Sequence, residues 1–206
     1  MGFDIEYERL ERKTKIKKVL GYIIRWTLAV TLTVAAAWAV TRYCLEITNM
    51  LGDSMNITLE DGDTVMINKL AYVRNDPERF DVIVFEQNDR EHNFYNIKRV
   101  IGLPVEKVQI ADGCVYINGE LLDEPMNVDK MELAGLAARE MVLDSDEFFV
   151  LGDNRNNCED SRFTTVGNVV RQEIIGSAWL RTNQFGIIGK MNVSKNNNAS
   201  NEDKKD

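Results

Sequence analysis

The stretch VLGYIIRWTLAVTLTVAAAWAV, Val19–Val40, sets the architecture of the chain because it separates a short basic segment from a long acidic one. Its 22 residues carry one charge, Arg25, near the end where a long side chain can reach the lipid headgroups. As a helix it would be roughly 33 Å long, against about 30 Å of hydrocarbon in a bilayer. It predicts a transmembrane helix over residues 19–41. Its expected interfacial anchors are Trp26, Trp38 and Tyr43.

Basic residues gather before this stretch and predict its orientation. Six Lys or Arg lie between Arg9 and Lys18, whereas Arg42 alone follows closely. By the positive-inside rule, the chain crosses the cytoplasmic membrane once, with its N-terminus in the cytoplasm and residues 42–206 outside. Two other interpretations are a cleaved signal peptide, for which the stretch is long and lacks an A-x-A exit, and a buried core helix, which would show a polar face.

The flanking sequence divides into three further parts. Residues 1–18 form a basic cytoplasmic stub, and residues 42–190 form the extracytoplasmic domain. Residues 191–206 hold five Asn and no aromatic residue, so they cannot bury enough apolar surface to offset the entropy of ordering. We predict a disordered tail there.

Short apolar runs separated by turn signals predict a mostly β domain with an antiparallel sheet. Val, Ile and Phe dominate the runs, and Asp112-Gly113 and Asn118-Gly119 are spaced as in a meander. The expected strands are 64–68, 81–86, 96–101, 107–110, 115–117, 148–151 and 174–180. Within the domain, Met131–Met141 is the one segment with a helical pattern, although it contains a glycine.

Composition and missing motifs exclude several classes of function. The formal net charge of −8 argues against a protein that binds nucleic acid through phosphate contacts. The one histidine, His92, lies in a polar loop where a solvated side chain is expected, and a zinc site with two imidazoles is excluded. The sequence contains neither G-x-x-x-x-G-K-[ST] nor G-x-S-x-G.

Three segments carry a more specific signal: LGDSMNITLEDGD at 51–63, IKRVIGLP at 97–104 and, as the third segment, GDNRNNCEDSR at 152–162; the strand RFDVIVF at 79–85, between the first two, is a further match. In this order, behind a single anchor, they make the chain similar to the bacterial type I signal peptidases, the membrane-bound Ser-Lys leader peptidases. Segments of that family run approximately G-x-S-M-x-P-T-L-x-x-G-D, R-G-D-I-V-V-F, K-R-V-I-G-L-P-G-D and G-D-N-R-D-N-S-x-D-S-R. The similarity extends over about residues 20–190.

The resemblance implies a signal-peptidase-like β catalytic domain and a serine endopeptidase. Such an enzyme cleaves signal peptides from secretory preproteins after small, A-x-A-like residues through an acyl-enzyme, and it needs no metal or cofactor. The implied partners are secretory preproteins, the lipid bilayer and the translocation machinery.

By the same resemblance, Ser54 is the nucleophile and Lys98 the general base. A serine hydroxyl needs a base to take its proton, and burial among apolar groups disfavours the ammonium form of a lysine. Lys98 lies in a predicted strand in which Lys98 and Val100 share one face. Arg99 would then point away from the base. Gly52 is expected to let backbone approach closely and to free amides for an oxyanion.

The third segment is expected to surround the base. Cys158 stands where family members often have a small hydroxyl residue that contacts the lysine, and a thiol is a weaker hydrogen-bonding group. Asp160 should form an ion pair with Arg99 or with Arg162, and a plain surface salt bridge is the alternative.

The resemblance also assigns residues to substrate pockets, and the sequence departs from the family pattern at a few positions. Met55, Leu59 and Ile97 would line shallow apolar pockets for small residues, although Met55 and Leu59 could equally belong to the core. Ile57 stands where the family usually has proline, and Val105 begins a Val-Glu pair where the family has Gly-Asp.

Other functions compete with this reading. A LexA-like Ser-Lys self-cleaving repressor would lack the anchor and usually carries a DNA-binding domain. The signal peptidase of the endoplasmic reticulum uses a histidine where Lys98 stands. A catalytically inactive anchored β module that binds exported chains is the alternative from another class, and the departures at Ile57, Val105 and Cys158 favour it.

Overall fold

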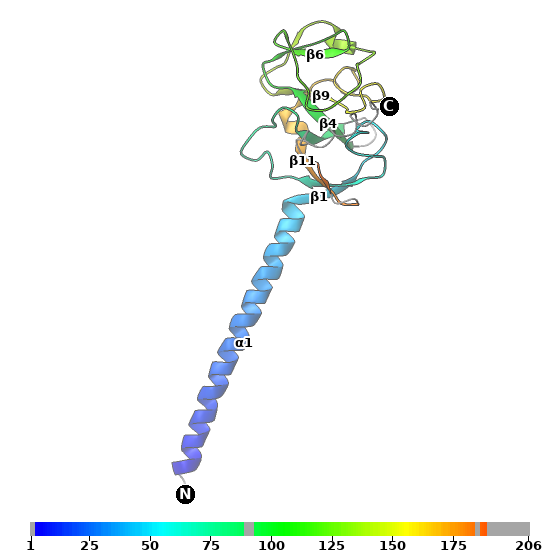
Figure 1. Ribbon diagram of the computed structural model, residues 1–206. Coiled ribbons are helices and arrows are strands. Elements are labelled where there is room, and N and C mark those ends of the chain that lie inside the picture. Colours follow the sequence, from blue (N-terminus) through cyan, green and yellow to red (C-terminus); the bar gives the residue numbers. More distant parts are fainter. Residues whose placement is uncertain (1–2, 89–92, 184–185, 189–206) are drawn as a thin grey trace, which may run out of the picture. The chain divides into compact units, whose positions relative to one another are not determined.

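The chain forms two units, residues 1–44 and 45–206, which are considered separately. The structure, a computed structural model, describes residues 3–88, 93–183 and 186–188. The predicted tail 191–206 and the polar loop around His92 lie outside the described residues. The first unit is one continuous helix, α1 (Phe3–Tyr43), which covers both the predicted stub and the predicted span (Figure 1).

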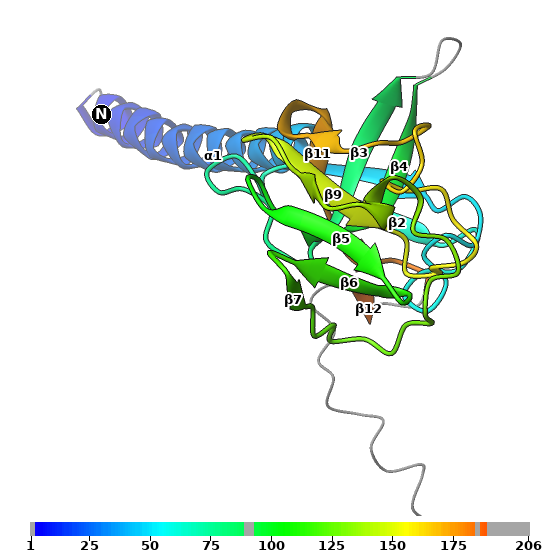
Figure 2. The ribbon, with the colours of Figure 1, turned by 90° about the horizontal axis from the view of Figure 1, so that it is seen from above.

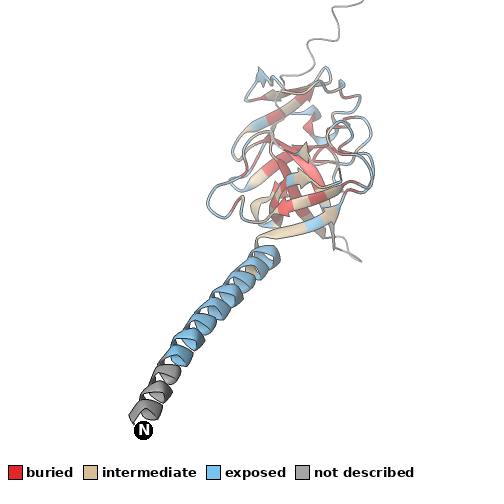
Figure 3. Cartoon of the chain, turned by 60° about the horizontal axis from the view of Figure 1, so that its bottom comes forward, coloured by how far each residue is buried: buried red, intermediate tan, exposed pale blue. Residues whose placement is uncertain are grey.

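Helix α1 has the surface of a membrane-spanning segment. Its stretch Lys15–Tyr43 is long and apolar enough to cross a bilayer, and its most apolar part is not buried against the described part of the protein (Figure 3). The hydroxyl groups of the threonines in this stretch donate hydrogen bonds to backbone carbonyls in the preceding turn. Thr31 Oγ1, for example, donates to the Thr27 carbonyl at 2.8 Å. These bonds satisfy the polar groups internally, which an apolar environment requires.

The second unit is built from antiparallel strands, as the sequence predicts. Its larger sheet runs β1-β2-β11-β3-β4-β9-β10, with β12 paired to β11. The strands of this sheet are β1 (Leu45–Asn49), β2 (Thr64–Asn68), β3 (Val82–Asn88), β4 (Asn93–Gly102), β9 (Glu147–Leu151), β10 (Val169–Val170), β11 (Ile174–Arg181) and β12 (Gly186–Ile187).

The smaller sheet has the order β7-β6-β5-β8, and Figure 2 shows β5, β6 and β7 side by side. Its strands are β5 (Lys107–Ala111), β6 (Cys114–Ile117), β7 (Glu120–Leu121) and β8 (Met141–Val142). The tight turn between β5 and β6 uses Asp112 and Gly113, both at positive φ. This is the Asp-Gly hairpin turn that the sequence indicates.

All seven predicted strands are present, but the predicted helix over Met131–Met141 is wrong. That segment holds only a 3₁₀ turn, η1 (Gly135–Ala138), and Met141 already belongs to β8. Gly135 has φ +57 and lies so close to Arg162 that a Cβ atom would collide with the Arg162 backbone. The segment therefore follows the surface of the 152–162 loop and cannot continue as a helix. A second 3₁₀ turn, η2 (Arg171–Glu173), precedes β11.

Three clusters of buried apolar residues fill the β unit. Figure 3 shows buried residues along its strands. Two residues of β4 enter different clusters: Ile97 joins one cluster with Met55 and Leu59, whereas Val100 joins another with Ile83 and Phe148. Strand β4 thus runs through the middle of the unit. A side chain on it, such as that of Lys98, is placed by packing on both faces of the sheet.

Candidate active site

Ser54 and Lys98, 44 positions apart in sequence, meet in the structure. The Nζ of Lys98 lies 2.8 Å from the Oγ of Ser54, which is hydrogen-bonding distance. Ser54 belongs to the loop that joins β1 to β2, and Lys98 to the central strand β4. A nucleophile and its base in direct contact are the arrangement that general-base activation of a serine requires.

Lys98 is buried, with 4% of its surface exposed. Burial lowers its pKa below the ordinary value of 10.5, and it outweighs the negative charges of Cys158, Asp160, Asp153 and Glu159, which act to raise it. Burial also raises the pKa of the Cys158 thiol to about 11, so this thiol is neutral at pH 7 and opposes the loss of the lysine proton only at alkaline pH. The amine is therefore biased towards its neutral, basic form.

The loop of residues 50–63 carries Ser54, the expected nucleophile, and is called here the nucleophile loop. Backbone hydrogen bonds close its two ends and form a turn in its middle. Two backbone bonds close the base: Met50 N–H donates to the Asp63 carbonyl at 2.7 Å, and Gly62 N–H donates to the Met50 carbonyl at 3.0 Å. In the centre, the Met55 carbonyl accepts from the N–H of Thr58 and of Leu59. Short-range bonds thus shape the loop, with no strand ladder through Ser54 itself.

Gly52 provides a positive-φ conformation in the loop. The prediction that backbone packs closely against Gly52 is wrong. Its φ is +77, a value that favours glycine, and a Cβ atom there would meet nothing within 4 Å. Its N–H donates to Asp61 Oδ1 at 2.7 Å, so this amide is occupied by the loop.

The close approach occurs at Gly152, which the sequence reading did not single out. A Cβ atom on Gly152 would lie 2.5 Å from Cys158 Sγ and 2.6 Å from the Ser54 carbonyl oxygen. Asn154, two residues later, bonds twice to the nucleophile loop. Its N–H donates to the Ser54 carbonyl at 3.1 Å, and its side-chain amide donates to the Asp53 carbonyl at 3.1 Å. A glycine at 152 is what allows the third segment to lie against Ser54.

Asp160 pairs with Arg162, one of its two expected partners. Its Oδ1 accepts from Nε of Arg162 at 2.8 Å, and its Oδ2 accepts from Nη2 of Arg162 at 2.9 Å. The alternative of a surface salt bridge is wrong, because the side chains are 0% and 2% exposed. Cys158 Sγ donates to Asp160 Oδ2 at 2.8 Å and Gly152 N–H donates to the same oxygen at 3.2 Å.

Arg99 pairs with Asp153, a residue that the sequence reading missed. Arg99 Nε donates to Asp153 Oδ1 at 2.8 Å and Nη2 donates to Asp153 Oδ2 at 2.6 Å, with both side chains at most 1% exposed. A second missed pair joins Arg155 to Glu124, from the loop after β7. The signal in the sequence was the density of charged residues in GDNRNNCEDSR, which is unusual for a segment that the fold buries.

Met55, Leu59 and Ile97 lie together in one core cluster, with exposed fractions of 0%, 0% and 3%. This matches the alternative in which Met55 and Leu59 belong to the core. Their role in lining substrate pockets stays a prediction, since a core side chain can still form the floor of a pocket.

Two of the departures from the family pattern occupy positive-φ positions. Ile57 has φ +106 and Val105 has φ +62, where a β-branched residue is strained. Glu106, after Val105, accepts from Leu103 N–H at 2.8 Å and pairs with Arg79 at 2.5 Å. A glutamate therefore supplies the hydrogen bonds that hold this turn together.

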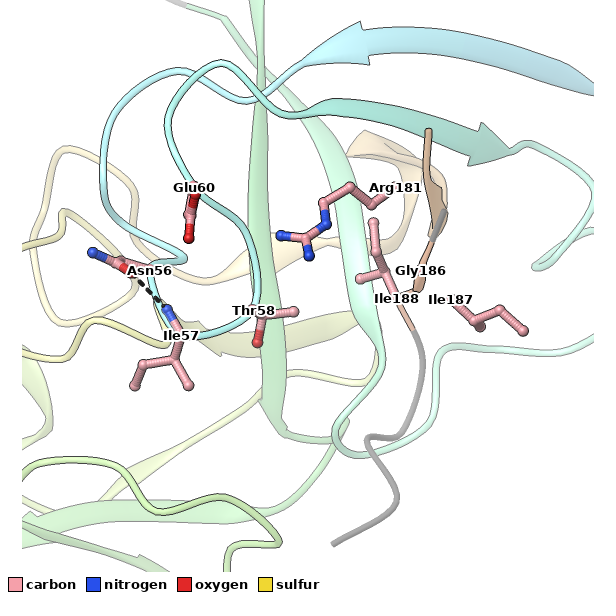
Figure 4. A pocket seen from close by; sticks show the side chains of 8 residues that line it. All are labelled: Asn56, Ile57, Thr58, Glu60, Arg181, Gly186, Ile187 and Ile188. Carbon is pink, nitrogen blue, oxygen red and sulfur yellow. Dashed lines mark hydrogen bonds between the residues drawn. The ribbon is translucent and has the colours of Figure 1, made fainter. Parts of the chain in front are cut away.

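A pocket of about 330 Å³ opens beside the nucleophile loop (Figure 4). One side is lined by the loop residues Asn56, Ile57, Thr58 and Glu60, and the other by Arg181 and residues 186–188. Figure 4 shows the guanidinium of Arg181 directed towards the loop, and Arg181 Nη1 donates to Asp63 Oδ2 at 3.0 Å. The loop is thus tied to the end of β11.

Comparisons with known proteins identify the family. The family model "Signal peptidase, peptidase S26" matches residues 23–182. A probable signal peptidase I-2 from Synechocystis sp. is 35% identical over 84% of this chain and 81% of its own length. Signal peptidase I from Leptolyngbya laminosa is 38% identical over 77% of this chain and 80% of its own. Signal peptidase I T from Bacillus subtilis is 31% identical over 81% of this chain and 88% of its own. The matched region contains Ser54, Lys98 and the whole 152–162 segment, and the chain belongs to the signal peptidase family, peptidase S26.

Proposed function

We propose that this membrane-anchored protein is a serine endopeptidase in which Ser54 and Lys98 cleave signal peptides from secretory preproteins. The observation that carries the assignment is the 2.8 Å contact between Ser54 Oγ and the Nζ of a lysine that is 4% exposed. Membership of a signal peptidase family supports the choice of substrate, because the relatives compared above are named as signal peptidases.

Acylation uses the neutral amine as the base. Lys98 Nζ takes the proton from Ser54 Oγ while this oxygen forms a bond to the carbonyl carbon of the scissile peptide. The tetrahedral intermediate collapses when the carbon–nitrogen bond breaks and the Lys98 ammonium returns its proton to the leaving amine. The mature protein leaves with a new N-terminus, and the signal peptide remains as an ester of Ser54.

Deacylation repeats the same chemistry with water. The neutral Lys98 takes a proton from a water molecule, the hydroxide attacks the ester carbon, and the proton returns to Ser54 Oγ as the ester bond breaks. The Ser54 backbone N–H is the first donor that we assign to the oxyanion. Since position 52 has no side chain and its N–H is bonded to Asp61, the second donor must come from elsewhere in the loop or from water.

The same proposal includes topology and partners. Residues 1–18 form the cytoplasmic stub, residues 19–41 cross the bilayer, and residues 42–190 act outside the cytoplasmic membrane, followed by the tail 191–206. The basic residues before the span support this orientation. Secretory preproteins are the substrates, and the translocation machinery that delivers them is a further proposed partner.

Small residues before the cleaved bond are the expected specificity. Met55, Leu59 and Ile97, which are buried together, would form the floor of shallow pockets that large side chains do not enter. The substrate would dock as an added extended strand.

Cleavage of a preprotein in detergent micelles tests the proposal. We expect the wild type to cut after a small residue, and Ser54→Ala and Lys98→Met to lose at least 1,000-fold in kcat, in line with the loss of a nucleophile or its base. Thr48→Ala, on β1, is the control. Full activity of either dyad variant would refute the assignment, and binding of preproteins without cutting by the wild type would favour the inactive module.

A further inference from the structure

Thr58, four residues after Ser54, contacts both members of a buried ion pair through its hydroxyl. Its Oγ1 donates to Asp153 Oδ2 at 2.5 Å and accepts from Nη2 of Arg99 at 3.1 Å. Arg99 and Asp153 are each 1% exposed. Hydrogen bonds to charged groups in such surroundings are the strong and directional ones, so this hydroxyl is firmly held.

Each member of the ion pair is adjacent in sequence to a residue that contacts Ser54. Arg99 follows Lys98 in β4, and Asp153 precedes Asn154, whose N–H donates to the Ser54 carbonyl at 3.1 Å. The hydroxyl of Thr58 is therefore the point at which the nucleophile loop, the strand of the base and the third segment meet.

The local backbone needs such an anchor. Ile57, directly before Thr58, has φ +106, a backbone conformation that is strained for a β-branched residue. Strain of this kind persists only where the surroundings fix the backbone. The turn bonds to the Met55 carbonyl shape the loop from within, and the Thr58 hydroxyl fastens it to the fixed strand beneath.

We propose that Thr58 is a positioning residue, whose hydroxyl fixes the nucleophile loop so that Ser54 Oγ stays within proton-transfer distance of Lys98 Nζ. The inference rests on the proposed function, because it concerns the rate of the reaction assigned to Ser54. Thr58 acts through Arg99 and Asp153 and contacts neither reacting atom.

The arrangement has an electrostatic consequence for the base. The negative charges near Lys98 come from Cys158 when ionised, Asp160, Asp153 and Glu159, and each acts to raise its pKa. The hydroxyl of Thr58 shares the charge of Asp153 with Arg99. Removing it leaves more negative charge facing the ammonium, and a loosened loop admits water to it. Both changes raise the pKa of Lys98.

The test compares Thr58→Val, which keeps the shape and removes the hydroxyl, with Thr58→Ser, which keeps the hydroxyl, in the full chain in detergent. We expect Thr58→Val to lower kcat at least tenfold with KM within twofold, and to move the acidic limb of kcat/KM to higher pH. Thr58→Ser should restore kcat to within threefold of the wild type. Thr182→Val is the matched control, because its hydroxyl bonds to the Thr64 carbonyl away from the dyad.

Thermal unfolding of every variant separates positioning from folding. A Thr58→Val protein that melts earlier but keeps the wild-type kcat and acidic limb overturns the inference, and so does failure of both Thr58→Val and Thr58→Ala to fold. If the wild type itself cuts no preprotein, the proposed function fails. With an active wild type, an unchanged Thr58→Val removes only the role of Thr58.

Discussion

Replacing Gly152 by alanine should damage the site through a single methyl group. The added Cβ would lie 2.6 Å from the Ser54 carbonyl oxygen, 2.5 Å from Cys158 Sγ and 2.9 Å from Cys158 Cβ. Real Cβ contacts essentially never fall below 3.0 Å, so the Ser54 carbonyl must retreat by about 0.4 Å or more. The hydroxyl proposed as the nucleophile, Ser54 Oγ, belongs to the residue that moves.

The size of the effect follows from this displacement. Inserting a methylene into a packed site costs about 1–3 kcal/mol of stability. A misplacement of about 1 Å can cost roughly 100-fold in rate, so a shift of half that size should lower kcat about tenfold. Since the substrate contacts are not altered directly, KM should change little.

Cleavage kinetics and thermal unfolding measure the two effects separately. The double variant Gly152→Ala/Cys158→Ala removes the collision with sulfur and keeps those with the Ser54 carbonyl and with the Cβ atom of residue 158, so it should recover more stability than activity. Gly186→Ala is the control, because a Cβ there meets nothing within 4 Å. A Gly152→Ala protein with the melting temperature and kcat of the wild type would show that the approach of the third segment to Ser54 is not tight.

Three further predictions follow from the buried charges and the strained turn. Activity should rise with pH along an acidic limb set by Lys98, whose pKa burial lowers below 10.5. The stability linked to this group is present above about 10.5 and is lost as the pH falls through the folded-state pKa. A stability–pH titration should therefore show Lys98→Met gaining most over the wild type at the acidic end. Asp160→Asn should lower the free energy of unfolding by about 3 kcal/mol in a denaturant titration, because Arg162 keeps a buried charge without its counter-ion; a loss below 1 kcal/mol would contradict this. Val105→Gly should raise the melting temperature, with a gain of about 0.5–1 kcal/mol, because φ +62 strains valine and its side chain is 70% exposed; a lower melting temperature would argue against strain at that turn.

Sequence patterns predicted the strands well because each signal is local. The run TVMIN alternates between buried and half-buried residues as β2, and Asp112-Gly113 has the backbone of a hairpin turn. The segment Met131–Met141 misled the prediction because its helical spacing is real, whereas the reason against a helix is a contact with Arg162, a residue distant in sequence. Tertiary packing overrides propensity in such segments.

The site was predictable as a set of residues but not as a set of contacts. The motifs point to Ser54 and Lys98, and the structure brings them together. The pairing of Arg99 with Asp153 could not be predicted from the sequence. Arg99 and Arg162 have the same chemistry, as do Asp153 and Asp160, and only the path of the backbone decides which arginine meets which aspartate. The close approach of Gly152 to the Ser54 backbone was not predicted, because the sequence shows a glycine but not the residues that pack against it.

Three ion pairs around the third segment, each made by a buried arginine, have a common physical role. Between β9 and β10 the chain runs through residues 152–168 without a regular strand or helix, so a backbone ladder cannot fix its position. Apolar packing would bury this segment but is non-directional, whereas an arginine fork bonds a carboxylate in one geometry. Buried ion pairs add little net stability compared with apolar groups of the same size. Their value here is therefore positional: Arg99, Arg155 and Arg162 fix an irregular segment whose backbone must contact Ser54 to within a few tenths of an ångström.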